Sequence, residues 1–238
     1  MDHGTRLQQA AKQVAQLRRS VAADDQARVW VRAIKTWQAH RLARTHRDLM
    51  SEPRHGPAAR FFLQDLYGAK DFSQRDAELV KIVPMMVRLL PDAALATIAD
   101  AVEMDALSER MDLALARDLR PTDPAAIDEA EYAAAYRRAG ARAEREHQLE
   151  LIVTIGHSLD RLVRHPMLGR LLKAMAGPAR LAGLSQMHDF LARGFDAFRA
   201  IGGASEFLSR IEARERAILE ALYAGARSGW SEVPEERP

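Results

Sequence analysis

Several positions in this sequence carry a charged or imidazole side chain where the helical period predicts an apolar one. In the stripe Leu208, Ile211, Glu215, Ile218 and Leu222, the glutamate takes a place on the face that should pack inward. The same pattern puts His188, Asp76 and the pair Arg41 and Arg44 on apolar faces of three other stretches. An unpaired charge in a core costs several kcal/mol, so we expect these groups to have partners.

The pattern predicts a buried or half-buried polar network but leaves its pairings open. Glu215 can pair with Arg41 or with Arg44, and Arg75 or Arg214 can pair with Asp65 or Asp76. One interpretation is that the network only orients the helices. The other is that it lines a small-molecule pocket with Tyr67, Asp76 and His188 on its polar rim. The candidate ligand-binding residues are Arg41, Arg44, Asp65, Tyr67, Asp76, His188, Arg214 and Glu215.

The sequence predicts no metal site and no cofactor. There is no Cys, which excludes thiolate nucleophiles, iron–sulfur clusters and Cys-ligated zinc. A di-iron carboxylate bundle needs two Glu-x-x-His pairs, and only Glu144 with His147 fits that spacing. A single His on an apolar face, such as His188, is more typical of a core histidine than of a heme ligand. Phosphate-loop, dinucleotide, nucleophile-elbow and zinc-protease motifs are also absent, so whether the protein is an enzyme is left open.

Charge and hydropathy argue against nucleic acid and membrane partners. The 35 Lys and Arg residues nearly balance the 33 Asp and Glu residues, which leaves a net charge of +2. The one compact basic segment, residues 41–47, would spread its charges over more than one helix face, whereas phosphate binding favours a one-sided patch. No apolar run is long enough to cross a bilayer or to form a signal peptide. We therefore expect a cytoplasmic protein.

The arrangement of Gly, Pro and periodic apolar residues predicts an all-α protein, a bundle of about eight to ten helices. Long stretches are expected over 5–21, 25–50 with Asp24 or Asp25 as cap, 92–119 and 125–140, with a last antiparallel pair over 184–201 and 204–223. We predict one helical domain over residues 1–225, with 120–124 as a candidate subdomain boundary and a polar tail over 226–238.

The run FFLQDLYGAKDFSQRD, residues 61–76, concentrates aromatic and charged residues around one glycine. Gly68 is expected to end a helix over 58–67, and Ser73 with Asp76, or Asp71, to begin the next. We expect its aromatic residues to pack in the core.

This run, together with the Arg214 and Glu215 pair in the last stretch, resembles an uncharacterised family of bacterial helical proteins that carry FFLxDLYGxxDFxxRD. The resemblance spans about residues 37–223. It implies a shared fold and shared chemistry at the turn, and it carries no known activity.

Two functions follow from these observations. The hypothesis favoured by the absence of catalytic motifs is a non-enzymatic protein that acts through protein–protein contacts, as a homo-oligomer or with another protein. The alternative is a small-ligand-binding or metal-binding protein, or an enzyme, with a buried polar site. A monomer in solution with a deep, well-formed internal pocket would count against the first hypothesis. Polar side chains that point to solvent or lie in separate places would count against the second.

Overall fold

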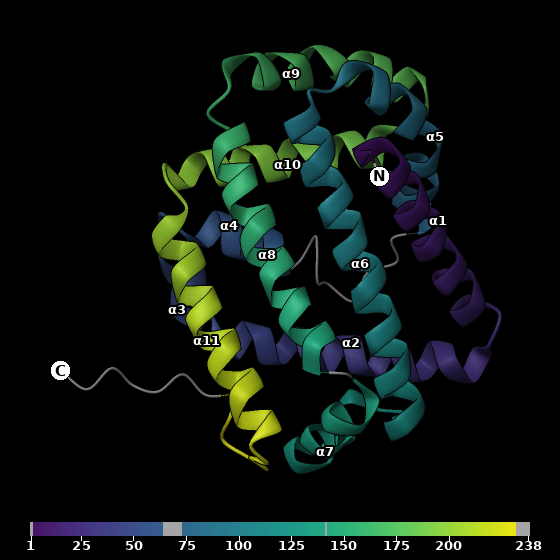
Figure 1. The fold of residues 1–238 in the computed structure, drawn as a ribbon, viewed down its shortest axis with the longest axis vertical. Helices are drawn as coiled ribbons and strands as arrows, with labels where there is room; N and C mark the ends of the chain where they lie inside the picture. The colour runs from purple at the N-terminus through teal and green to yellow at the C-terminus, as the bar shows by residue number, and fades with distance from the viewer. Residues whose placement is uncertain (1, 64–72, 141, 232–238) are drawn as a thin grey trace.

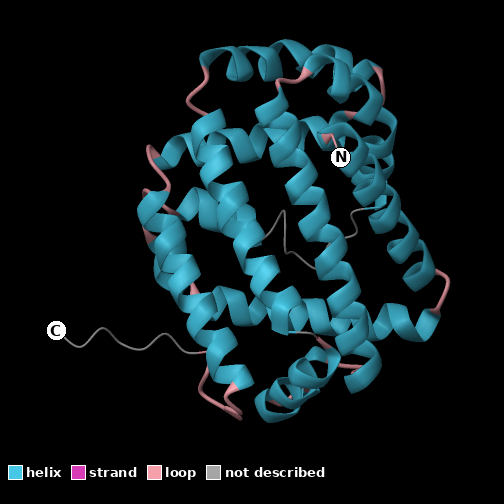
Figure 2. Ribbon diagram, in the orientation of Figure 1, coloured by secondary structure: helices cyan, strands magenta, loops and turns pink. Residues whose placement is uncertain are grey.

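The structure is a computed structural model that describes residues 2–63, 73–140 and 142–231, without the side chains of 73–77 and 89. The described residues form helices and no strands, as the sequence predicts (Figure 2). They form eleven α-helices and one short 3-10 helix, slightly more than expected because two α-helices are only five and six residues long. The elements are α1 His3–Ala22, α2 Asp25–Thr45, α3 Arg47–Ser51, α4 Gly56–Phe61, α5 Ser73–Leu89, α6 Asp92–Leu119, η2 Pro124–Ala126, α7 Glu129–Ala139, α8 Arg142–Leu162, α9 Pro166–Leu181, α10 Ser185–Ile201 and α11 Ser205–Tyr223.

The second helix begins where the sequence predicts and ends earlier. The Asp24 carboxylate caps α2 by accepting from the backbone N–H groups of Gln26 and Ala27, both at 3.0 Å. The expected single helix to residue 50 is broken at His46, whose φ of −115° and ψ of 25° lie outside the helical region. The chain restarts as α3. The break leaves the His46 side chain buried between helices.

Three long helices set the shape of the molecule. In Figure 1, α6, α8 and α11 run along the long axis, with α8 packed between the other two and α1 against the outer side of α6. Helix α2 crosses their lower ends, and α7 lies at the same end. Helices α9 and α10 cross the upper end. The three long helices therefore connect two layers of crossing helices.

The last two helices do not form the antiparallel pair that the sequence predicts. Helix α10 crosses the bundle, whereas α11 runs along α8 (Figure 1). Gly202 and Gly203 adopt φ values of 65° and 133°, a backbone path that redirects the chain between the two helices. A short glycine connection indicates a sharp change of direction, and tertiary packing decides its angle.

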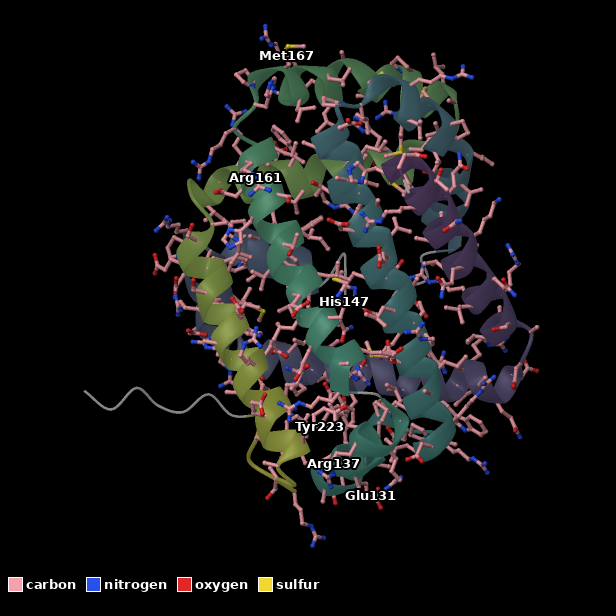
Figure 3. All side chains as sticks on the ribbon, viewed as in Figure 1. Glu131, Arg137, His147, Arg161, Met167 and Tyr223 are labelled. Carbon is pink, nitrogen blue, oxygen red and sulfur yellow. The ribbon has the colours of Figure 1, made fainter. Side chains whose placement is uncertain are left out.

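Buried side chains from both sides of residues 120–124 pack together. The Trp37 ring on α2 stacks on Tyr132 of α7 with centroids 4.1 Å apart, and its Nε1–H donates to the carbonyl of Ile127 at 3.1 Å. At the far end of α7, Arg137 donates to the carbonyl of Leu222 at 2.8 Å (Figure 3). These contacts join α7 to α2 and to α11.

The first two residues of the aromatic run are core residues, as expected. Phe61 and Phe62 are buried, with ring centroids 5.4 Å from Phe190 and 5.6 Å from Phe198. The predicted cap residues Gly68 and Asp71 lie outside the described residues. So does the Asp76 side chain, although its backbone belongs to α5.

Candidate functional site

A cavity of about 410 Å³ lies between the long helices and the two crossing layers. Its volume falls in the range of small-molecule binding sites. Most of its wall is apolar, and α5, α9 and α10, which lie toward the upper end in Figure 1, contribute mainly Leu, Met and Phe side chains. Representative apolar lining residues are Leu79, Met86, Ile98, Val102, Ile152, Leu159, Phe190 and Leu191.

The polar part of the wall comes from the end where α2 and α7 lie. It combines cations, carboxylates, amides and phenols from five helices and from one residue beyond α2. Its polar residues include Lys35, Gln38, Arg41, His46, Glu109, Asp112, Tyr132, Tyr136, Arg145, Gln148 and Glu215. The cavity is therefore amphipathic, with an apolar region and a region rich in hydrogen-bonding groups.

Glu215 is the centre of the first polar cluster. The Arg41 guanidinium donates to both of its carboxylate oxygens at 2.6 and 2.7 Å, and His46 Nε2–H donates to Oε1 at 2.9 Å. Burial by itself would raise the pKa of Glu215, but the charge of Arg41 and the hydrogen bond from His46 outweigh it and lower that pKa to about 2. Glu215 is thus ionised at neutral pH.

A second cluster forms around Glu109 of α6. Glu109 accepts from Lys35 and from Arg18 Nε, the latter at 2.9 Å. Burial opposes ionisation of this carboxyl, yet the two cations lower its pKa. One turn further along α6, burial raises the pKa of Asp112. The negative charge of Glu109 adds to this rise, and the charge of Lys35 opposes it. Two neighbouring carboxyl groups are thus shifted in opposite directions.

Arg145 of α8 differs from the other cations of the wall. Only 4% of the residue is exposed, and its guanidinium lies over the Tyr136 ring, 4.2 Å from the centroid. Its Nε and Nη2 have no hydrogen-bond partner among the described residues. A buried cation without a carboxylate partner is costly, which makes this position unusual.

The structure brings together two of the residues that the sequence singles out. Arg41, rather than Arg44, pairs with Glu215, and both line the cavity. Arg44 is exposed, and its Nη2 lies 3.8 Å from a carboxylate oxygen of Glu129. Arg214 pairs on the outer side of α11 with Asp48, at 2.7 Å.

His188 has a structural contact away from this cluster. Its Nε2–H donates to the carbonyl of Leu172 at 2.9 Å and ties α10 to α9. It is a satisfied histidine between two helices, and it is not among the residues that line the cavity. The predicted residues Asp65 and Tyr67, and the Asp76 side chain, lie outside the described part of the chain.

Sequence reasoning missed Lys35, His46, Glu109, Asp112 and Arg145. Two of these obey the rule that identified Glu215. Glu109 stands in a stripe of buried residues with Val102, Ala106, Leu113 and Ala116, and Arg145 precedes Leu149, Ile152 and Ile155 at helical spacing. Lys35 and Asp112 carry no such signal, because a cavity allows polar groups to face inward at irregular positions.

Glu144 and His147, the pair considered as metal ligands, lie outside the cavity wall. Glu144 accepts from Arg110 at 2.6 Å, and the His147 side chain, labelled in Figure 3, is half exposed. Among the described residues, no group of three His, Asp or Glu side chains is arranged to hold a metal ion. Within the same residues, no helix is both long and apolar enough to span a bilayer.

Comparison with protein families gives one match. A family model described as a domain of unknown function, DUF8198, matches residues 17–229. The chain belongs to this family. No curated protein and no solved structure matches this DUF8198 chain, so its function has to be inferred from the cavity and its wall.

Proposed function

We propose that this protein binds a small molecule in the cavity between its helices. The observation that carries the proposal is an amphipathic cavity of about 410 Å³ whose polar groups converge from five helices. Conformational freedom of the ligand would be restricted by the apolar wall, while the polar end would fix its orientation.

The energetic cost of an unfilled cavity supports this proposal. Enclosed dry apolar cavities cost about 24 cal/mol per Å³, so leaving the apolar region of this cavity empty would lower stability. Water alone is a poor occupant of the apolar region, because a buried water needs several polar partners. A ligand with an apolar part would recover this free energy.

The test is native mass spectrometry of the full chain purified from the cells that naturally produce it. We expect a bound mass that is released on denaturation. Ala101→Leu adds bulk to the cavity wall and should reduce the bound fraction. Ala217→Leu makes the same change at an exposed position of α11 outside the cavity and should not. A mass equal to the bare chain, or equal bound fractions in both variants, would refute the proposal.

A second candidate, protein–protein contact, is favoured by the exposed face of α9. Met167, Leu171 and Leu181 are 65%, 40% and 92% exposed, and Met167 projects from the top of the molecule in Figure 3. The helix also contains Arg170, Lys173 and Arg180 and no acidic residue. A basic apolar face suits a partner protein with an acidic surface. Two copies meeting symmetrically there would oppose like charges.

The oligomeric state tests this second candidate. On light scattering, we expect a monomer when the chain is pure, and we expect the partner captured from its natural host to be acidic. Capture should be lost in the variant Leu181→Glu. A stable dimer that Leu181→Glu dissociates would instead favour the homo-oligomer that the sequence suggested.

Both candidates assume one helical domain over residues 1–225, against which the buried Trp230 packs, that works in the cytoplasm. The contacts between α7 and both α2 and α11, and the absence of Cys, support this assumption. Proteolysis within 120–124 that releases two independently folded halves would contradict the single domain.

A further inference from the structure

Unsatisfied polar atoms concentrate on the cavity wall. Seven buried side-chain nitrogen atoms of the described residues lack a hydrogen-bond partner, and five of them belong to residues that line the cavity. The five are Arg41 Nε, His46 Nδ1, Arg145 Nε, Arg145 Nη2 and Trp230 Nε1. Buried polar groups in native proteins are nearly always satisfied, so this concentration indicates a missing partner.

Arg145 accounts for two of these atoms and is the strongest indication of the partner's charge. The other cations of the polar wall have carboxylates in contact, since Arg41 binds Glu215 and Lys35 binds Glu109. Arg145 forms no ion pair within the described part of the chain, and its guanidinium lies over the Tyr136 ring. It is therefore the cation of the polar end that has no carboxylate in direct contact there.

Asp112 does not supply the missing negative charge. Its carboxyl group is buried on the same wall, but it forms no ion pair with Arg145 in the structure as described. Burial raises its pKa and the negative charge of Glu109 adds to this, although the charges of Lys35 and Arg145 act in the opposite direction. The nearby carboxylates Glu109 and Glu215 are already bound to Arg18, Lys35 and Arg41.

We infer that the ligand of this cavity is an organic acid with an apolar chain, whose carboxylate pairs with Arg145. This inference rests on the proposed function and specifies its ligand class. A single uncompensated cation matches a carboxylate, with one negative charge, better than a phosphate ester with nearly two. The guanidinium offers five donors in one plane, a geometry that suits bidentate pairing with a carboxylate.

The polar end supplies a further donor for the same group. The indole Nε1–H of Trp230, a residue that lines the cavity, has no partner among the described residues. The apolar chain would extend toward α5 and α10, past Ile152, Leu159 and Phe190. The result is an acid group held at one end and a hydrocarbon chain covered by Leu, Ile and Phe side chains.

Calorimetric titration of the full chain tests this inference. The protein is first stripped of co-purified molecules on a hydrophobic resin and then titrated at pH 8 with decanoate and with decan-1-ol. These probes share their chain and differ in the charge of the head group. We expect decanoate to bind about 10- to 100-fold more tightly, the range that a charge-assisted hydrogen bond supports.

Two arginine variants locate the effect. Arg145→Met keeps an apolar stem and removes the charge, so the preference for decanoate over decan-1-ol should disappear. Arg44→Met removes an exposed arginine outside the cavity and should leave both affinities unchanged. Without ligand, Arg145→Met should be at least as stable as the original chain, because it removes an unpaired buried charge.

The outcomes separate this inference from the proposed function. If neither probe binds, both fail. If both bind equally, or if Arg145→Met keeps the decanoate preference, the cavity binds apolar molecules and the acid site is wrong. A large loss of stability in Arg145→Met would also overturn it, since that result would assign Arg145 a structural role.

Discussion

Replacing Glu215 with Gln should lower the free energy of unfolding by about 3 kcal/mol at pH 7. The pKa of this carboxyl falls from 4.5 to about 2 in the folded chain, and each unit corresponds to about 1.4 kcal/mol. The substitution also leaves Arg41 without its anionic partner, for which a loss of about 3 to 5 kcal/mol is typical. The estimate from the pKa shift and the estimate from the broken ion pair thus give a similar loss of unfolding free energy.

The pH dependence has a definite sign. Because folding lowers the pKa of Glu215, its contribution to stability is complete above pH 4.5 and is lost as the pH falls toward 2. By pH 3 about 2 kcal/mol of the contribution should be gone. The stability difference between the original chain and Glu215→Gln should therefore shrink from about 3 to about 1 kcal/mol between pH 7 and pH 3.

Urea unfolding followed by circular dichroism at several pH values measures this difference. Glu212→Gln is a matched control on the same helix, because Glu212 forms a surface pair with Arg216. The control should cost less than about 1 kcal/mol at pH 7. A Glu215→Gln difference that stays constant from pH 7 to pH 3 would refute the ionised Arg41–Glu215–His46 cluster.

Three glycines give further predictions, all measured by urea unfolding. A Cβ on Gly156 would overlap the Leu208 side chain, so Gly156→Ala should destabilise the chain by about 1 to 3 kcal/mol; a gain would contradict the close packing of α8 on α11. Gly177 lies in α9 with open space around it, and Gly177→Ala should stabilise by about 0.5 to 1 kcal/mol. Gly202 has a φ of 65°, and Gly202→Ala should cost about 1 to 2 kcal/mol, whereas an unchanged stability would argue against the left-handed turn.

The sequence was sufficient for the fold class and for most helix ends because both depend on local signals. Asp24 caps α2 through its own side chain, and the apolar stripe of α6 continues without interruption past Ser108, whose hydroxyl donates back to the carbonyl of Met104 at 2.8 Å. The break at His46 has no such signal. It depends on packing against α11, where the His46 ring binds Glu215.

The residues of the candidate site also fall into those that local sequence patterns predict and those that depend on tertiary packing. A charged residue within an apolar helical stripe is predicted to face inward. This pattern identified Glu215 and Arg41 from the sequence. The same pattern led to His188, which the structure shows bound to the backbone of α9. Periodicity identifies an inward direction, but the partner found there depends on how α10 and α11 cross, and that depends on tertiary packing.

Arg145 bears on both interpretations of the polar wall, a binding cavity and a network that only orients helices. An orienting network reaches its lowest free energy when every charge is paired, as Arg41 with Glu215 and Lys35 with Glu109 are. Arg145 is buried on the same wall, yet its Nε and Nη2 have no partner among the described residues. Proteins tolerate such local costs where a ligand compensates for them. The stability of Arg145→Met without ligand is thus the measurement that separates the two interpretations.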